Sequence, residues 1–357
     1  MGDIYGYCSF CPFCPSSAES GGDGSGRCPA NSGDVLARCR GDFVLDRDWL
    51  DLPDFPPFLR FRCVPCIDLA VFRDDVGRSG PVCVRGGGTR WDVGGDDAGA
   101  RSVLAPVGIE AFEPAEMTVT VGAGTTVATL SEALAECGQE VAIDGPHGST
   151  VGGALMVGRS PLRRGRLGEV ADVLLQADCV GADGALFTAG GPTVKNVTGY
   201  DLCRLLVGSL GTLALVGRVI LRTRPSPEAF AWMSGAVTSR EVTHVLYRPA
   251  TVLWDGIETT VRVEGNGRDV DEEVGRLQVL GMAPTVAPTL PPERDCWTGV
   301  LPPGGVLEVG AGVVHRPDRP EAGNVPVGVR ALGERVRDSF DPTRRLNPGR
   351  DPHRVSA

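Results

Sequence analysis

Glycine clusters that directly follow short apolar runs are the feature that most constrains this chain. Residues 82–84 lead into three consecutive glycines at 86–88, and residues 117–121 lead into a Gly-Ala-Gly turn at 122–124. Glycine has no Cβ, so successive backbone N–H groups of such a loop can turn toward one anion. The pattern predicts strands that end in loops able to approach a bound group closely, and a pyrophosphate suits the first loop.

Length, charge and hydropathy bound the class of protein. A chain of 357 residues with 42% apolar content can bury one large core or two smaller ones. The net charge of −10, with no dense basic face, argues against nucleic acid as a partner. No apolar run approaches the roughly 20 residues of a membrane span, and the first residues lack a signal-peptide pattern. We therefore expect a cytoplasmic protein without direct membrane insertion.

Apolar periodicity in the first half predicts a mixed α+β arrangement. Strands are expected at 82–84, 117–121 and 173–180, because each is a short apolar run bounded by turn residues. Residues 127–134 carry apolar side chains at helical spacing, with a threonine at 125 or 126 as cap and a glycine at 138 as stop. The Ala-Asp-Gly sequence at 182–184 is typical of a hairpin turn.

A Pro-Ser-Pro sequence at 225–227 marks a boundary, and a second set of elements follows it. Residues 250–254 and 259–263 are expected to pair as a hairpin, followed by a helix with apolar positions between 270 and 277. The last predicted helix spans 329–340 and ends at an Asp-Pro pair.

The glycine loops together carry a family resemblance. The first loop is neither a P-loop, since no Lys-Ser or Lys-Thr pair follows it, nor a Rossmann fingerprint, since Trp91 stands where a third glycine would be. With Gly-Pro-His-Gly-Ser-Thr-Val-Gly-Gly at 145–153 and the glycine-rich stretch 190–213, it resembles the FAD-binding domain of the vanillyl-alcohol oxidase / p-cresol methylhydroxylase (PCMH) superfamily. Residues 195–202 and 340–350 are most similar to the FAD-binding subunit of glycolate oxidase.

The resemblance implies a fold and a division of the chain. It implies an α+β fold, in which a PCMH-type FAD-binding domain of two α+β subdomains carries a small α+β cap. The FAD-binding domain is expected at 64–225, the cap or substrate domain at 226–320, and a C-terminal helix with a return to the FAD site at 321–357. Residues 1–63 are expected to be a low-complexity, cysteine-containing extension, either unstructured or the product of a start codon assigned too far upstream.

The resemblance also implies the residues that bind FAD. They are the first loop, Arg85, Gly86, Gly87, Gly88, Thr89 and Arg90; the second loop, Ser149, Thr150, Val151, Gly152 and Gly153; and Lys195, Asn196, Gly211, Thr212, Val216 and Asn347 further along. Some relatives attach flavin through a histidine in the first loop. Because Thr89 and Arg90 follow the glycines here, we expect FAD to be bound non-covalently.

A histidine near neutral pKa suits the uptake of a substrate hydroxyl proton. We predict His315 as the catalytic residue, because it follows an apolar, glycine-flanked strand and precedes Arg316, which could hold a carboxylate. The alternative is a strand-end histidine hydrogen-bonded to backbone. His147 is expected to be a loop residue near the cofactor. No two of the four histidines have ligand spacing, so we predict no catalytic metal.

The implied function is that of an FAD-dependent oxidoreductase that oxidises a small 2-hydroxy acid such as glycolate. Such subunits work beside a second flavoprotein subunit and an iron–sulfur subunit, through which the protein could be associated with a membrane. Two alternatives stay open. One is a non-catalytic, FAD-bearing assembly subunit, and the other is a different alcohol or aldonolactone oxidase of the same superfamily.

Cysteines and one basic cluster leave further alternatives. Cys8, Cys11 and Cys14 have the spacing of a ferredoxin iron–sulfur site, but Ala18 stands where the fourth cysteine belongs. A zinc site is another interpretation of these cysteines. The five cysteines after residue 66 are expected to be small buried apolar residues. The arginines at 163, 164 and 166 are expected on a solvated face, or else in contact with a phosphate or a partner.

Overall fold

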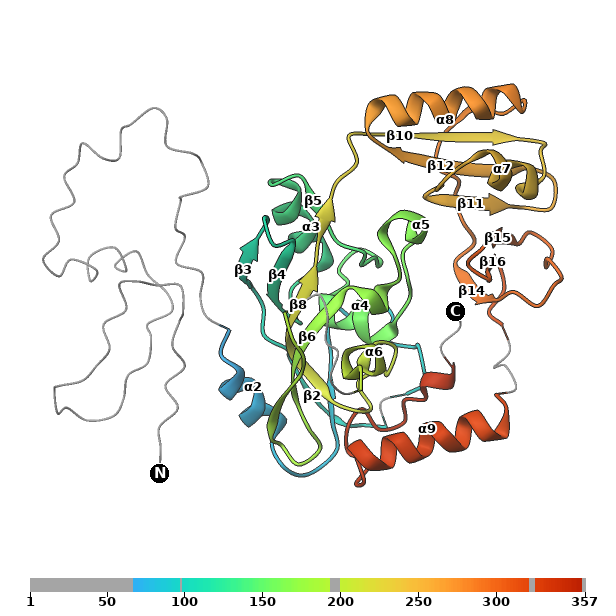
Figure 1. Ribbon diagram of the computed structural model, residues 1–357. Helices are drawn as coiled ribbons and strands as arrows, with labels where there is room; N and C mark the ends of the chain where they lie inside the picture. Colours follow the sequence, from blue (N-terminus) through green and yellow to red (C-terminus); the bar gives the residue numbers. More distant parts are fainter. Residues whose placement is uncertain (1–66, 97, 193–199, 321–324, 355–357) are drawn as a thin grey trace, which may run out of the picture. The chain divides into compact units, whose positions relative to one another are not determined.

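The computed structural model describes residues 67–96, 98–192, 200–320 and 325–354 (Figure 1). The expectations for residues 1–63, with their cysteine pattern, and for Lys195 and Asn196 lie outside these residues. The residues from Ile67 onward form one compact unit. This unit has the mixed α+β arrangement that the sequence predicts, with two large antiparallel sheets.

The first sheet has five strands in the order β3-β4-β8-β6-β7. Its members are β3 (Ile109–Glu113), β4 (Thr118–Gly122), β6 (Leu174–Val180), β7 (Leu186–Gly190) and β8 (Leu215–Arg222). The strands predicted at 117–121 and 173–180 are thereby confirmed, as is the hairpin, whose Gly184 has φ +75°. Helix α2 (Leu69–Val76) packs on β8, where a Cβ at Gly217 would lie 2.8 Å from Phe72.

Short elements complete this part of the chain. Strands β1 (Val82–Val84) and β2 (Arg101–Val103) pair in parallel, and β5 (Gln139–Glu140) pairs with β9 (Arg224–Pro225). The predicted helix is α3 (Val127–Ala135), whose first turn is capped by Thr126 accepting a hydrogen bond from Thr129 N. The remaining helices are α4 (Val151–Val157), α5 (Arg164–Leu167), α6 (Leu202–Leu206) and the 3-10 turn η3 (Val170–Asp172).

The second sheet begins at β10 (Ala229–Gly235), just after the Pro-Ser-Pro sequence. Its seven strands run in the order β13-β10-β12-β11-β15-β16-β14. The other six are β11 (Thr251–Trp254), β12 (Thr259–Gly265), β13 (Ala283–Thr285), β14 (Glu293–Cys296), β15 (Val306–Glu308) and β16 (Val313–Arg316). The predicted hairpin is β11–β12, and the predicted helix is α8 (Gly267–Val279), which lies along β10 and β12 with α7 (Ser239–Val245) nearby (Figure 1). We call this sheet with α7 and α8 the cap.

The chain then returns to the first part of the unit. Helix α9 (Val327–Phe340), predicted at 329–340, packs Val336 and Phe340 against the larger core, and the turn η4 (Pro352–Arg354) follows. After α9 the backbone runs beside β1, where Val82 N donates to Arg345 O and Asn347 N donates to Val82 O, both at 2.9 Å. The tertiary structure thus brings residues 82 and 347 together.

The cysteine prediction is wrong for two of the five. Cys83, Cys179 and Cys203 are buried, as expected, but Cys137 and Cys296 are exposed. Cys137 follows the end of α3, and Cys296 ends strand β14 at the edge of the second sheet. Both sit where the chain leaves a packed element, and composition alone does not distinguish such positions from core positions.

Candidate functional site

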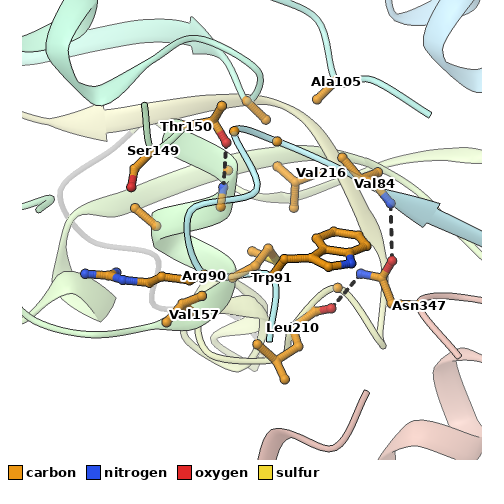
Figure 2. Close-up of a pocket in the computed structure, with 18 of the residues that line it drawn as sticks. Val84, Arg90, Trp91, Ala105, Ser149, Thr150, Val157, Leu210, Val216 and Asn347 are labelled. Carbon is orange, nitrogen blue, oxygen red and sulfur yellow. Dashed lines mark hydrogen bonds between the residues drawn. The ribbon is translucent and has the colours of Figure 1, made fainter. Parts of the chain in front are cut away.

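One cavity lies where the glycine loops meet the C-terminal return. It encloses about 920 Å³ when the open solvent at its mouth is included. Most of its lining comes from the loop after β1, the segment around α4, the segment before and into β8, and the return, with Ala105 and the turn after β4 completing it (Figure 2). Val84 and Arg350, which both line it, are 266 positions apart in sequence, so only the fold creates the site.

The first loop packs backbone to backbone against the second. An added Cβ at Gly87 would lie 1.8 Å from the carbonyl oxygen of Gly148, and one at Gly86 would lie 2.3 Å from Thr150 Oγ1. Gly88 has φ +70°, a conformation that L side chains rarely adopt. The glycines are therefore needed for the two loops to touch, in addition to any close approach to a ligand.

Hydroxyl groups tie the second loop in place. Thr89 Oγ1 and Ser149 Oγ lie 2.9 Å apart, across the two loops. Thr150 precedes α4 and accepts a hydrogen bond from Gly153 N at 3.2 Å (Figure 2). Gly152 N donates to Ala123 O at 2.7 Å, which fixes the start of α4 against the turn after β4. The two loops thus present backbone and hydroxyl groups along one wall of the cavity.

Asn347 joins three segments at the other wall. Its Oδ1 accepts from Val84 N at 3.2 Å, and its Nδ2 donates to Leu210 O at 2.6 Å (Figure 2). Gly211 lies so close that a Cβ there would be 2.3 Å from Asn347 Nδ2. The amide therefore sets the spacing between the first loop's strand and the segment that enters β8.

An aromatic ring held by two arginines forms a further part of the lining. The guanidiniums of Arg85 and Arg350 lie 4.9 and 4.5 Å from the centroid of the Trp91 ring. Arg350 also donates to the carbonyl oxygens of Trp91, Val93 and Gly95. Trp91 and Arg350 both line the cavity, so the C-terminal return shapes the first loop as well as touching its strand.

The structure brings most of the predicted cofactor residues to this cavity. Those that line it are Gly86, Gly87, Gly88, Thr89, Arg90, Ser149, Thr150, Gly152, Gly153, Gly211, Val216 and Asn347. Three others do not line it: Arg85 stacks on Trp91, and Val151 and Thr212 are buried in the protein interior. The cofactor roles of all these residues stay predictions.

Several lining residues were not anticipated from the sequence. They are Val84, Trp91, Val93, Ala105, Ala123, Gly124, Ala154, Met156, Val157, Leu210, Ala214, Leu215 and Arg350. The Gly-Ala-Gly turn at 122–124 was visible as a loop signal, and Leu210 and Gly211 have φ values of +53° and +68°. The apolar members carry no sequence signal that separates a cavity wall from a core position.

His315 is not among the residues that line the cavity. It is buried in β16 of the cap, where its Nε2 lies 2.6 Å from Glu308 Oε1. Its neighbour Arg316 pairs with Asp295 at 3.3 Å. The partner of His315 is therefore a carboxylate, whereas the structural alternative expected a backbone group. His147 is exposed on the second loop.

The basic cluster at 163–166 faces the cap, so the expectation of a solvated face is wrong for its first two members. Arg163 binds Glu140 and Glu264 in two bidentate contacts of 2.7–2.9 Å. Arg164 pairs with Glu308 at 3.1 Å. Because Glu264 and Glu308 belong to the second sheet, these arginines fasten the cap to the rest of the unit.

Comparison with known proteins places the cavity in context. Residues 73–190 match the family described as FAD binding domain. Glycolate oxidase subunit GlcE of Escherichia coli (strain K12) is 32% identical over 153 residues, 42% of this chain and 44% of that protein. D-lactate dehydrogenase of Archaeoglobus fulgidus is 34% identical over 151 residues, 42% of this chain and 34% of that protein. This chain thus matches less than half the length of either relative.

Two further matches extend the comparison. Glycolate oxidase subunit GlcD of Bacillus subtilis (strain 168) is 40% identical over 80 residues, 22% of this chain and 17% of that protein. A solved structure of alkyldihydroxyacetonephosphate synthase superposes with a TM-score of 0.55 at 13% identity, covering 75% of this chain and 71% of that one. At 13% identity, the similarity to alkyldihydroxyacetonephosphate synthase concerns the fold alone.

The family match supplies the cofactor, and the superposed structure supports the fold. The chain carries a PCMH-type FAD-binding domain, and the predictions of this fold and of FAD as cofactor are confirmed. The resemblance to the FAD-binding subunits of glycolate oxidase is confirmed as well. The cavity fits the group by its chemistry, because glycine backbone and the hydroxyls of Thr89 and Ser149 line it and leave room for an anionic diphosphate to approach the main chain. Non-covalent attachment stays a prediction.

Proposed function

We propose that this chain, with its PCMH-type FAD-binding domain, is the FAD-binding subunit of an oxidoreductase that oxidises the CH–OH group of a small 2-hydroxy acid. Glycolate is the first candidate substrate. One observation carries the proposal: a glycine-walled cavity occurs in a chain whose relatives are named glycolate oxidase subunits and a D-lactate dehydrogenase.

The chain's own residues have distinct roles in this proposal. When bound, FAD supplies the two-electron acceptor. The backbone of residues 86–89 and of 150–153 would hold its diphosphate, since neither stretch places a bulky side chain over the cavity. Asn347 would keep the wall formed by β1 and Leu210 in place through its two amide hydrogen bonds. The apolar lining, which includes Met156 and Val157, would exclude water from the reaction.

A specific observation favours a second candidate function. Among the described residues that line the cavity, the titratable side chains are two arginines, Arg90 and Arg350, and none is a histidine, a lysine or a carboxylate. A hydroxyl proton needs an acceptor within hydrogen-bond reach. The chain could therefore carry FAD as an assembly subunit without turning over substrate itself.

The partners belong to the same proposal. Two of the relatives are named as subunits of glycolate oxidase, which supports an assembly with a second flavoprotein subunit. An iron–sulfur subunit would then accept the electrons. None of the described helices is long and apolar enough to cross a bilayer. We propose that any association with a membrane is through these partner subunits.

An anaerobic titration tests the function. The purified, FAD-loaded protein is mixed with glycolate, D-lactate and L-lactate in turn, and the visible flavin absorbance is followed. Bleaching by a 2-hydroxy acid supports the oxidoreductase. Absorbance that no 2-hydroxy acid changes, with or without the partner subunits, contradicts it. Bleaching only when partner subunits are present favours the assembly role.

A further inference from the structure

Partly buried arginines gather where the cavity meets the cap. Arg90 lines the cavity, Arg159 follows α4, and Arg294 belongs to β14 of the cap. Burial lowers the pKa of each guanidinium. The positive charge of Arg294 further lowers the pKa of Arg90, that of Arg90 lowers the pKa of Arg159, and that of Arg159 lowers the pKa of Arg294. The three positive charges thus lie within electrostatic range of one another.

Two donors of this group have no acceptor. Arg90 Nη1 and Arg294 Nε are shielded from solvent and make no hydrogen bond to any described residue. The Arg90 side chain extends past Ser149 and Val157 and away from Trp91 (Figure 2). A buried donor of a charged group is costly to leave unsatisfied. Arg90 lines the cavity beside Val157, and Arg294 is bonded to Ser160 three residues further along, so both unpartnered donors lie near the end of α4, where a small anion could satisfy them.

The acidic side chains nearby do not supply the missing acceptors. Glu308 is shared by three groups: Arg294 at 3.2 Å, Arg164 at 3.1 Å and His315 at 2.6 Å. The other carboxylates within electrostatic range of the three arginines are Asp92, Asp144 and Glu293. Asp92 pairs with Arg319 at 3.0 Å, and Asp144 is exposed and accepts from Gly145 N.

Arg294 is held by two contacts that leave only its Nε without a partner among the described residues. Its Nη1 donates to Ser160 O at 3.1 Å and its Nη2 donates to Glu308, while its side chain is only 12% exposed. Ser160 follows α4, the helix whose residues line the cavity. The cap residue Arg294 is thereby fixed to the FAD-binding part of the chain.

We propose that Arg90 and Arg294 together bind the carboxylate of a small 2-hydroxy acid at the boundary between the cavity and the cap. This inference rests on the proposed function and adds the substrate-binding residues to it. A guanidinium matches a carboxylate in geometry and charge, which favours arginine for this task. The apolar lining residues Met156 and Val157 suit the short carbon chain of glycolate or lactate.

The same two N–H groups could also donate to phosphate oxygens, so a second source of the anion is the FAD diphosphate. The experiment separates these sources by measuring two dissociation constants on each full-length protein. One is for oxalate, a carboxylate that cannot be oxidised at a CH–OH group, titrated into the FAD-loaded protein by calorimetry. The other is for FAD, titrated into the apoprotein.

The variants are Arg90→Gln, Arg294→Gln and Arg294→Lys, with Arg268→Gln as the control. Arg268 lies on α8 of the cap, where its side chain is exposed and pairs with Glu272 at 3.4 Å. Each glutamine variant at 90 or 294 is expected to weaken oxalate binding about 10- to 100-fold, as the loss of a charge-assisted contact predicts. FAD binding by the two Arg294 variants should change less than about threefold, Arg294→Lys should lose less oxalate affinity than Arg294→Gln, and the control should match the wild type.

Several results would overturn the inference. Unchanged oxalate binding in both glutamine variants would do so, and so would a loss of FAD affinity in place of oxalate affinity. Thermal unfolding of each variant shows whether it is folded, and a destabilised Arg294→Gln is replaced by Arg294→Lys in the comparison. If the wild type binds no oxalate although glycolate bleaches its flavin, the anion site fails and the proposed function stands. If oxalate binding depends on both arginines although no 2-hydroxy acid bleaches the flavin, the oxidoreductase role fails alone.

Discussion

Replacing Gly87 by alanine tests whether the contact between the two glycine loops builds the FAD site. The new Cβ would lie 1.8 Å from the carbonyl oxygen of Gly148, whereas real Cβ contacts are not shorter than 3.0 Å. The loops must therefore separate by about 1.2 Å, the difference of these distances. The obstacle is backbone on both sides, so a side-chain rotation cannot relieve it. Overpacking of this kind costs about 1–3 kcal/mol.

The displaced loops line the cavity, so we expect the cost to appear in FAD binding. A loss of 1–3 kcal/mol corresponds to about a 5- to 150-fold increase in the dissociation constant. The assay is a titration of apoprotein with FAD, followed by flavin fluorescence, with thermal unfolding of the apoprotein measured in parallel. Gly275→Ala is the matched control, because a Cβ at this position in α8 meets nothing within 4 Å. The control should bind FAD normally and be more stable by about 0.5–1 kcal/mol.

One result would refute this reasoning. If Gly87→Ala binds FAD within about twofold of the wild type, and its apoprotein unfolds at an unchanged temperature, then the loop contact neither shapes the cavity nor stabilises the fold. A lower unfolding temperature with unchanged FAD affinity would assign the contact to folding alone. It would then remove Gly87 from the predicted cofactor site.

Three further outcomes are expected. Arg163→Gln leaves two carboxylates without their bidentate partner and should destabilise the protein by about 3 kcal/mol, read from its urea midpoint; an unchanged midpoint would mean that the cap is held by other contacts. Iodoacetamide should label native protein at exposed Cys137 but not at Cys203, because burial raises the Cys203 pKa to about 11 and keeps the thiol protonated well above neutral pH. Peptide mass spectrometry reads both sites, and equal labelling would contradict the buried position. Asn347→Ala removes the hydrogen bonds to Val84 N and Leu210 O and should lower the free energy of unfolding by about 1–3 kcal/mol. FAD binding should also be weaker than in the Gly275→Ala control. Wild-type stability and wild-type FAD affinity would show that the amide does not hold the cavity wall between β1 and Leu210 in place.

Local sequence signals predicted the elements that surround the site. Helix α3 follows from apolar spacing and a threonine cap, and the β6–β7 hairpin follows from a turn that needs a glycine with positive φ. These features depend on residues within a few positions of one another. Backbone conformation at that range is decided by local sterics and hydrogen bonding, which the sequence displays directly.

The glycine loops were recognised from the sequence, but their neighbours were not. The glycine at 87 indicates that the position does not tolerate a Cβ. Only the structure shows that the carbonyl oxygen of Gly148 occupies the space that a Cβ would need. The Arg163 cluster shows the same limit. Its charge was evident, while its two carboxylate partners at 140 and 264 come from different sheets.

The sequence predicted His315 as the catalytic residue, with Arg316 able to hold a carboxylate, and neither side chain is among the residues that line the cavity. Strand pairing sets Arg294 directly opposite His315, and the fold then places Arg294, and neither of these two, within range of Arg90 at the cavity. The sequence alone determined the FAD-binding class of fold, its strands and helices, and the loops that receive the cofactor. The tertiary structure decided which distant charges meet beside that cofactor, because contacts between residues some 200 positions apart depend on the packing of whole sheets and have no local signature.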